Sequence, residues 1–330
     1  MATWASRLSL IVAVFAMVAT LAIRWLSVDD TSSSSTSINF VSQDLFHESA
    51  DWDAKHNRFI LSALRFSGGG LFEVTLKLFQ LDLNGNEAGA ILQAKKVAAL
   101  QEAGGPTFLG VRVDPPRNRV LVVLSTLKKD YSGLAAYDLS SWELLFKIDL
   151  EEGPSFADDV AVDKEGNAYV TDTLKNRLWK VAPDGSKSWV LTDSPVLQVS
   201  GPLPFDIATV NGIVYHPDGY LLVNHFSGGA LFKVSLDGAS VQRVNVSGNL
   251  FMADGMTLLS PDKVVVASVL GTKLVASSDG WETAEVTNKY TGPLQRLGTA
   301  VFMKDGKPYT SFAFGLGIRE FSHSIREAVF

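Results

Sequence analysis

Four oxygen-bearing side chains stand at equivalent positions in a repeated unit of this 330-residue chain, each just before a stretch of alternating apolar and polar residues. They are Glu48, Asp158, Asn211 and Asp254. Three carboxylates gathered at one axis would repel one another and raise one another's pKa values unless a cation neutralised them. Oxygen ligands select a hard ion, and irregular spacing with several waters suits Ca2+ better than Mg2+. The sequence therefore predicts a calcium ion held by these four residues.

The repeated unit consists of two alternating strands joined by a tight turn, and it is clearest in FADDVAVDKEGNAYVTDT, from Phe156 to Thr173. Six copies occur, and their first positions are separated by 62, 48, 53, 43 and 44 residues. These first positions are Glu48, Gly110, Asp158, Asn211, Asp254 and Gly298. Periods in the forties of β-hairpin units are typical of propellers, whose blades are four-stranded sheets around an axis. We therefore predict an all-β chain that folds as a six-bladed β-propeller with a central metal site.

The same pattern assigns the remaining strands. Blades two and six begin at glycine, so we expect no side-chain ligand from them, and we find no arginine in register with the ring for gripping a sugar acid. In blade one we expect the third and fourth strands within Gly68–Leu83, while Lys95–Glu102 is either an outer strand or a short helical turn. Since the last blade leaves room for only three strands, Ile38–Ser42 is predicted to add the fourth and close the ring.

The second strand of each blade should end on the face of the disc where the first strand starts. Thr171, Asp172, Asn224 and His225 are therefore expected near the mouth of the site. For Asp172 and His225 the favoured interpretation is that they hold loops together through hydrogen bonds.

Composition limits the classes of function. The chain is 46% hydrophobic and 19% charged, an ordinary globular composition with enough apolar residues for a large core. Its net charge of -6 argues against nucleic acid as a partner, because phosphate-binding surfaces carry a basic excess. The absence of cysteine excludes disulfides, thiol chemistry and cysteine-type zinc sites. A small-molecule substrate is the expected partner.

The N-terminal segment differs from the rest of the chain. Residues 8–23 form an unbroken apolar run of 16 residues, which fits a secretory h-region better than a membrane span of roughly 20. We therefore predict a signal peptide or signal anchor in residues 1–28, a Ser/Thr-rich linker in 29–37 and the propeller in 38–330. The chain is expected in the secretory pathway: secreted, vacuolar or luminal, or anchored to a membrane through residues 8–23. The sequon Asn245-Val246-Ser247 is compatible with glycosylation on that route.

The motifs around the candidate ligands resemble those of the six-bladed calcium propellers of the senescence marker protein/gluconolactonase family. They are Glu48 in ESADWD, Asp158-Asp159 before VAVDKEG, Asn211-Gly212 before IVYHPDG, and Asp254-Gly255. The wider superfamily includes paraoxonases, diisopropyl-fluorophosphatase and strictosidine synthase-like proteins, and the resemblance covers residues 38–330. It implies a catalytic calcium held by Glu48, Asn211 and Asp254, with Asp158 as a further ligand or a substrate contact. Family members usually have Asn at this last position, so the extra charge is expected to tighten calcium binding and to weaken its Lewis acidity.

The activity that we expect from this resemblance is calcium-dependent hydrolysis of a lactone, ester or phosphotriester. Calcium would polarise the reacting oxygen and activate a bound water, and Asp254, Glu48 or His225 would take the proton. Two alternatives stay open, because a shared fold does not establish a shared chemistry. One is a non-catalytic binding propeller that calcium stabilises; the other is a strictosidine synthase-like enzyme, which needs an acid–base residue rather than a metal.

Overall fold

The computed structural model describes residues 36–41, 47–63, 77–82, 92–93, 95–98, 107–126, 128–292, 296–315 and 322–330. Within these ranges the regular structure is β-strand, apart from three short 3-10 turns: η1 (Ala54–His56), η2 (Pro115–Arg117) and η3 (Pro195–Leu197). Alternating sequences form strands here because successive side chains of a strand point to opposite faces of its sheet. The prediction of an all-β fold is therefore confirmed for the described residues.

Consecutive strands pair with one another in antiparallel, four-stranded meanders. The first meander consists of β2 (Ala50–Asp53), β3 (Arg58–Ala63), β4 (Lys77–Asp82) and β6 (Lys95–Ala98). The second consists of β7 (Thr107–Asp114), β8 (Arg119–Ser125), β9 (Tyr131–Asp138) and β10 (Leu144–Glu152). The third consists of β11 (Ala157–Val162), β12 (Ala168–Asp172), β13 (Arg177–Val181) and β14 (Ser188–Thr192).

Two further meanders share one eight-stranded sheet, in which their outer strands β18 and β22 pair in parallel. One contains β15 (Val210–His216), β16 (Tyr220–His225), β17 (Ala230–Ser235) and β18 (Val241–Ser247). The other contains β19 (Ala253–Ser260), β20 (Lys263–Ser268), β21 (Thr272–Ala276) and β22 (Thr283–Tyr290).

The last sheet is built from both ends of the chain. It contains β23 (Arg296–Lys304), β24 (Lys307–Gly315), β25 (Ser322–Glu327), β1 (Ser37–Val41) and β5 (Leu92–Gln93). β1 pairs antiparallel with β25, from Ser37 opposite Arg326 to Val41 opposite Ser322. The predicted pairing of Ile38–Ser42 with the last blade is thus confirmed for Ile38–Val41, while Ser42 lies outside the described residues, and it covers an edge of the last hairpin that would otherwise be unpaired.

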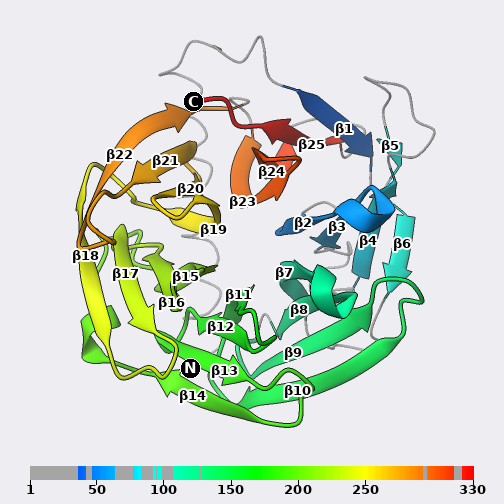
Figure 1. Cartoon of the computed structure of the whole chain (residues 1–330), viewed down its shortest axis with the longest axis horizontal. Helices are drawn as coiled ribbons and strands as arrows, with labels where there is room; N and C mark the ends of the chain where they lie inside the picture. The colour runs from blue at the N-terminus through cyan, green and yellow to red at the C-terminus, as the bar shows by residue number, and fades with distance from the viewer. Residues whose placement is uncertain are drawn as a thin grey trace.

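Figure 1 shows the meanders arranged around a central hollow, with β2, β7, β11, β15, β19 and β23 nearest the axis. The strands that come last in the meanders, such as β10, β14, β18 and β22, lie at the rim. This radial arrangement of twisted antiparallel sheets defines a β-propeller. The inner strands consequently carry whatever side chains reach the axis.

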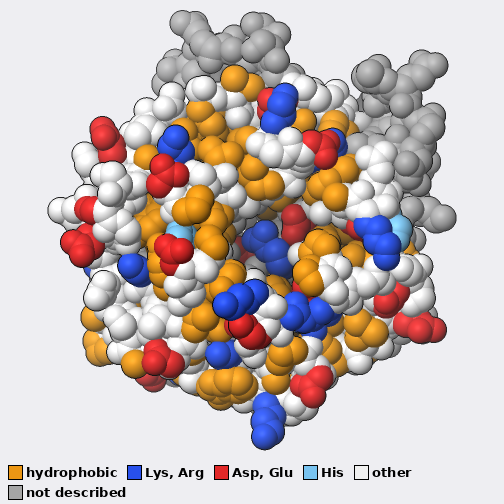
Figure 2. All heavy atoms as spheres, in the orientation of Figure 1, with side chains coloured by type: hydrophobic (Ala, Val, Ile, Leu, Met, Phe, Trp, Pro, Cys, Tyr) orange, Lys and Arg blue, Asp and Glu red, His pale blue; other side chains and the backbone are white. Residues whose placement is uncertain are grey.

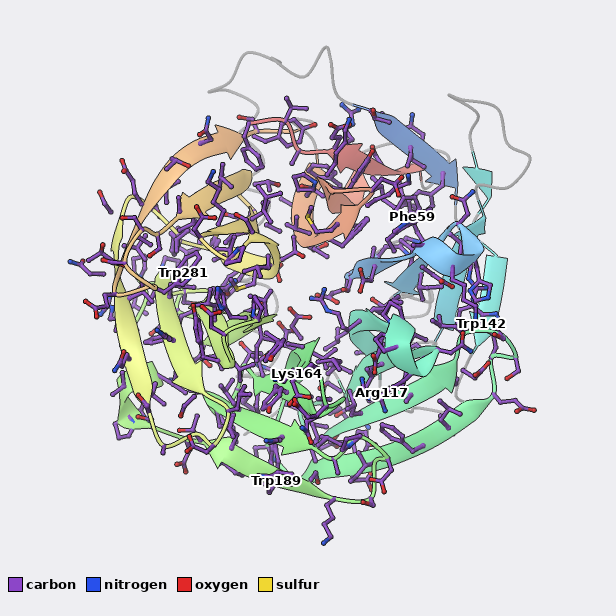
Figure 3. The ribbon with its side chains drawn as sticks, in the orientation of Figure 1. Phe59, Arg117, Trp142, Lys164, Trp189 and Trp281 are labelled. Atoms are coloured by element: carbon purple, nitrogen blue, oxygen red, sulfur yellow. The ribbon has the colours of Figure 1, made fainter. Side chains whose placement is uncertain are left out.

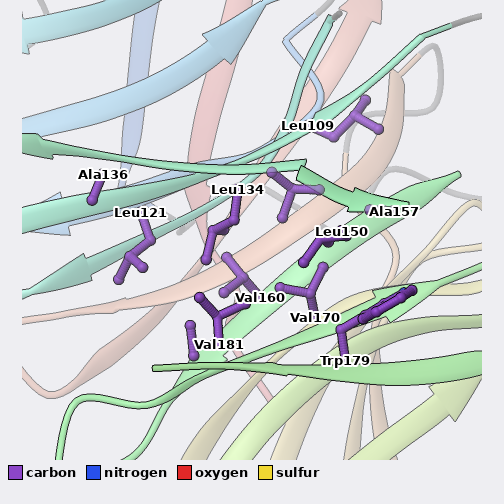
Figure 4. Packing of buried hydrophobic residues seen from close by; sticks show 12 residues of the cluster. Leu109, Leu121, Leu134, Ala136, Leu150, Ala157, Val160, Val170, Trp179 and Val181 are labelled. Carbon is purple, nitrogen blue, oxygen red and sulfur yellow. The ribbon is translucent and has the colours of Figure 1, made fainter. Parts of the chain in front are cut away.

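Apolar side chains fill the space between neighbouring meanders. Between the second and third, Leu121 and Val123 pack against Val160 and Val170, all fully buried, with Trp179 beside them (Figure 4). Each such side chain stabilises the fold by roughly 1.5–3 kcal/mol relative to an exposed one. The sheets therefore hold the inner strands at fixed positions around the axis.

Two of the inner hairpins end in a buried ion pair. Arg58 Nε donates to Asp53 Oδ2 at 2.9 Å, and Arg119 Nε donates to Asp114 Oδ2 at 2.8 Å. All four side chains are at least nine-tenths buried. We call this end of the inner strands the turn end.

The turn end also joins neighbouring meanders. Arg119 donates to the carbonyl oxygen of Gly166 in the third meander at 2.7 Å, and Arg117 donates to the carbonyl oxygen of Lys164 at 2.8 Å. Arg117 and Lys164 lie close to the central hollow in Figure 3. The basic residues at this end are therefore used to tie one meander to the next.

Other predictions are refined by the strands. Lys95–Glu102 begins with strand β6 and not with a helical turn, and β6 is the fourth strand of its meander. Of Gly68–Leu83, the described residues contain only the third strand, β4, so expecting the fourth strand there was wrong. The predicted leader and nearly all of the linker lie outside the described residues, and among the described residues no helix is long and apolar enough to cross a membrane.

Candidate functional site

A β-bulge lies at the start of most inner strands. In β11, Ala157 pairs with Asp172 and Val160 with Val170, so Asp158 and Asp159 together oppose a single residue. The same shift occurs in β7, β15 and β19, and β23 shifts register on both sides of Gly298. A bulge bends its strand and redirects the side chains of the extra residues. Here it changes the direction of the candidate ligand side chains relative to the ordinary alternation of a strand. We call this end of the inner strands, where each strand begins, the ring end.

The strand registers show which residues are equivalent at the ring end. Ala50 pairs with Leu61, and Val111 pairs with Val122. The residue equivalent to Glu48 in the second meander is therefore Leu109, and the sequence alignment placed Gly110 there in error by one position. The expectation that this meander offers no ligand at that position is unaffected, because Leu109 is buried and apolar.

A small cavity lies between the inner strands at the ring end, with a volume of about 10 Å³. That is about the space that one water molecule needs. Its polar lining residues are Glu48, Ser49, Arg112, Asp159, Asn211, Asp254 and Thr299. The structure thus brings together three of the four predicted metal ligands, and places Asp158 outside the lining. In the face shown in Figure 2, basic and acidic side chains are visible inside the central hollow.

Three oxygen atoms that line this cavity are buried and have no hydrogen-bond partner. They are Glu48 Oε2, Asn211 Oδ1 and Thr299 Oγ1. A buried acceptor without a partner costs about 1–3 kcal/mol, and more when it is charged. The cavity therefore has the lining of a site for a cation or a hydrogen-bond donor.

The carboxylates of this region destabilise one another's ionised forms. Burial, followed by the charges of Asp158, Asp254 and Asp159, raises the pKa of Glu48 well above its usual value. Burial, followed by Asp158 and Asp159, likewise raises the pKa of Asp254. The pKa of Asp158 rises to about 7 through burial and the charges of Asp159 and Asp172. A bound divalent cation would reverse these shifts by favouring the ionised forms.

The carboxylate of Asp159 accepts hydrogen bonds from two backbone N–H groups. Its Oδ1 accepts from Val160 N at 2.8 Å, and its Oδ2 accepts from Ile213 N of the next inner strand at 3.2 Å. Burial raises its pKa to about 6, while the charge of Arg112 opposes that rise. Since each of its oxygens accepts a backbone hydrogen bond, this carboxylate positions β11 against β15.

Arg112 is the one basic side chain among the lining residues, and sequence reasoning missed it. Its Nη1 lies 3.7 Å from Asp51 Oδ2, and its Nε donates to the carbonyl oxygen of Val160 at 3.4 Å. The sequence showed no arginine in register with the ring, whereas the structure places Arg112 of the second meander among the lining residues. The signal was present in the sequence as a charged residue in VRVD.

Thr171 and Asn224 hold the backbone of the ring end. Thr171 Oγ1 accepts from Asp159 N at 3.0 Å and donates to the carbonyl oxygen of Asn211 at 2.7 Å. Asn224 makes the same kind of bridge in the next meander: its Oδ1 accepts from Gly212 N, and its Nδ2 donates to the carbonyl oxygen of Asp254. Each side chain spans two inner strands, so it fixes where the next candidate ligand begins.

Asp172 has the structural role that was favoured for it. Its Oδ1 accepts from the backbone N–H groups of Phe156, Leu174 and Lys175 at 3.0–3.1 Å, and its Oδ2 accepts from Ser155 Oγ at 2.8 Å. The side chain is fully buried. It ties the start of β11 to the loop after β12.

His225 is also buried and holds a loop. Its Nδ1 accepts from Gly228 N at 2.9 Å, which leaves the ring proton on Nε2, and this nitrogen has no hydrogen-bond partner. Burial lowers the pKa of the imidazole to about 4, so the ring is neutral near pH 7. His225 is not among the residues that line the cavity. Its geometry favours the loop-holding interpretation.

The lining fits a calcium ion in the kind of donor that it offers. Glu48 and Asp254 supply carboxylates, and Asn211 supplies an amide oxygen that has no other partner. Within the described ranges, no three His, Cys, Asp or Glu side chains lie close enough to hold a metal. A site here would therefore depend on neutral oxygens and water for part of its coordination, which calcium accepts.

The fold is shared with solved structures at low sequence identity. The allergen Mala s 1 of Malassezia sympodialis has 15% identity and a TM-score of 0.66, over 88% of this chain and 96% of that one. Virginiamycin B lyase of Staphylococcus aureus, an inactive variant with quinupristin, has 10% identity and a TM-score of 0.54, over 90% and 99%. A chain of a nidogen/laminin complex has 17% identity and a TM-score of 0.51, over 76% and 90%.

These likenesses establish the class of the fold. The chain is a β-propeller, in agreement with its meanders and their closure. No family model and no curated protein matches the sequence. The comparisons therefore support the β-propeller fold. The narrower resemblance to gluconolactonase-type propellers rests on the sequence motifs.

Proposed function

We propose that this chain is a six-bladed propeller of the gluconolactonase type that binds one calcium ion at its ring end and hydrolyses a lactone, ester or phosphotriester. The observation that carries the proposal is the pair of unpartnered buried oxygens, Glu48 Oε2 and Asn211 Oδ1, in a cavity of about 10 Å³ beside the Asp254 carboxylate. The six blades are the five meanders and the sheet that β1 closes. Calcium is the cation that we assign, because the lining donors are oxygens.

The ligands that we assign are Glu48, Asn211 and Asp254. Asp158 lies outside the lining but close enough to raise the pKa values of Glu48 and Asp254, so it adds negative charge behind the site. Calcium bound there would supply Lewis acidity toward a carbonyl or phosphoryl oxygen and toward a water.

The residues of the chain have separate tasks in this proposal. Asp254 or Glu48 is the carboxylate that would take the proton removed from the water. Arg112 lies in the same lining and faces any negative charge that develops on the substrate. His225 is assigned no proton transfer, because its Nδ1 is occupied by Gly228 N–H.

A second candidate function is a non-catalytic propeller in which calcium only stabilises the ring. The size of the cavity favours it, since a volume of about 10 Å³ holds an ion or a water and not a substrate. In either case we propose that residues 1–28 direct the chain into the secretory pathway, with anchoring through residues 8–23 as the alternative to cleavage. Asn245 is exposed on β18, where a glycan would be accessible.

The test is calcium content together with turnover of a panel of lactones, aryl esters and phosphotriesters, on the full chain and on Asp254→Asn. We expect stoichiometric calcium and activity in the parent, and the loss of both in the variant. Asp218→Asn, at a side chain that is 74% exposed, is the matched control and should change neither. Calcium without activity would select the second candidate, and a parent without calcium would refute both.

A further inference from the structure

Thr299 directly follows Gly298, the position in the last blade where the sequence predicted no ligand. The last inner strand shifts register on both sides of Gly298, which pairs with Phe312, while Ala300 pairs with Ser311. Thr299 is thus the unpaired residue of a bulge, and it lines the central cavity. It is 95% buried, since its exposed fraction is 5%.

The hydroxyl of Thr299 differs from the other side chains at its register. The equivalent residue of the first meander is Ser49, whose Oγ accepts from Val111 N at 3.2 Å. In the third meander it is Asp159, whose oxygens accept from Val160 N and Ile213 N. These side chains join their inner strand to the next one. Thr299 Oγ1 is buried and makes no such bond, so it remains free to face the cavity.

We infer that Thr299 Oγ1 is a protein ligand of the central calcium ion, together with Glu48, Asn211 and Asp254. The inference rests on the calcium site proposed above and extends it to the sheet that both ends of the chain build. In this assignment the fourth oxygen of the lining comes from Thr299 and not from Asp158, which lies outside it.

The charges of this ligand set match the ion. Glu48 and Asp254 carry one negative charge each when ionised, and Asn211 and Thr299 contribute neutral oxygens, so the set balances a divalent cation. Calcium takes six to eight oxygen ligands, and water would supply those that the chain does not. The set also accounts for the finding that the described residues contain no metal-holding group of three His, Cys, Asp or Glu side chains, since two of its members are neutral.

The position of β23 places Thr299 beside the residues that precede the first inner strand, β2. β23 packs against β2, so the last inner strand adjoins the first. Glu48 and Ser49, just before β2, line the same cavity as Thr299. Calcium held by both would connect the two sheets that meet where the propeller closes.

The experiment is calcium titration by calorimetry on the full chain and on Thr299→Val, Thr299→Ser and Thr272→Val. The valine at 299 keeps the shape and removes the oxygen, and we expect the dissociation constant to rise about 10-fold or more, the scale of a lost group at a metal site. Serine restores the oxygen and should stay within about threefold of the parent. Thr272 is the control, because its hydroxyl is buried but pairs with Thr310 Oγ1 at 2.8 Å.

A second measurement separates a ligand from a residue that only supports the site. Terbium replaces calcium, and its luminescence lifetimes in H2O and D2O report the number of coordinated waters. We expect Thr299→Val to gain one water and Thr299→Ser to gain none. Equal calcium affinity and equal water count in the parent and Thr299→Val would overturn this inference alone. A parent that binds no calcium would overturn the proposed function and the ligand role together.

Discussion

Acidic residues have opposite surroundings at the two ends of the inner strands. At the turn end, Asp53 and Asp114 are buried against Arg58 and Arg119, with N–O distances of 2.9 and 2.8 Å. At the ring end, the carboxylates gather with one another, and burial and mutual repulsion raise their pKa values. The one arginine of that cavity, Arg112, lies nearer to the structural carboxylates Asp51 and Asp159.

The difference indicates which charges the fold uses for its own stability. A buried carboxylate with its guanidinium partner is complete without any ligand, whereas a group of carboxylates without one is complete only with a proton or a cation. The same residue type thus has a structural role at one end and, in our proposal, a ligand role at the other. Substitutions that remove a charge should therefore have opposite effects at the two ends.

The largest effect is expected at the turn end. Arg119→Met keeps the apolar stem but removes the buried guanidinium beside Asp114, which then has only the less buried Arg117 at 3.2 Å, and it should lower the free energy of unfolding by about 3 kcal/mol. Urea denaturation measures this loss, with or without calcium. Lys164→Met is the control, because its contact with Glu165 is 3.7 Å long and exposed, and it should cost less than about 1 kcal/mol. Equal costs for the two variants would remove the contrast between buried and exposed pairs.

The second-largest effect is expected at the ring end, where removing a charge should raise the stability of the calcium-free protein. Glu48→Gln removes a repelling charge, so the calcium-free protein should gain roughly 1–2 kcal/mol of stability, while calcium affinity falls about 100-fold. Thermal unfolding with and without calcium measures both. Asp53→Asn makes the same chemical change at the turn end and should destabilise the protein in both conditions. A loss of calcium-free stability in Glu48→Gln would show that the ring-end charge is structural.

A smaller effect should follow from pH. The pKa values of Asp158 and Asp159, about 7 and about 6, lie above those of unfolded carboxylates, so the native state binds these protons more tightly than the unfolded chain. The stability of the calcium-free protein should therefore fall by roughly 1–2 kcal/mol as the pH rises from about 5.5 to about 8. Denaturation midpoints across this range test it. Saturating calcium, or Asp158→Asn, should flatten the dependence; an unchanged slope would contradict the assignment.

The smallest effect is expected for His225. In His225→Asn the side-chain oxygen replaces Nδ1 as the acceptor for Gly228 N–H, so calcium affinity should stay within about twofold and stability should fall by about 1 kcal/mol. Calorimetry and urea denaturation measure the two quantities. A loss of turnover at unchanged affinity would instead assign His225 to proton transfer.

The sequence predicted the strands and their closure because alternation is a local property of the chain. It also singled out Glu48, Asn211 and Asp254, which line one cavity in the structure, because each stands at the start of a recognisable alternating stretch. It missed Arg112, which lies between apolar residues of its strand, and Thr299, which is the unpaired residue of a bulge. The bulges depend on neighbouring strands: a side chain on Gly212 would collide with the carbonyl oxygen of Asp254, so this packing is not encoded in the local pattern.

The pairing of β1 with β25 has a consequence for how the protein is made. Ser37 and its partner Arg326 are separated by nearly the whole chain, so β1 emerges from the ribosome long before β25 exists. At synthesis rates of about 5–20 residues per second, the first strand waits on the order of tens of seconds. During this time its edge is open to other chains, and the disc closes only after β25 has been synthesised.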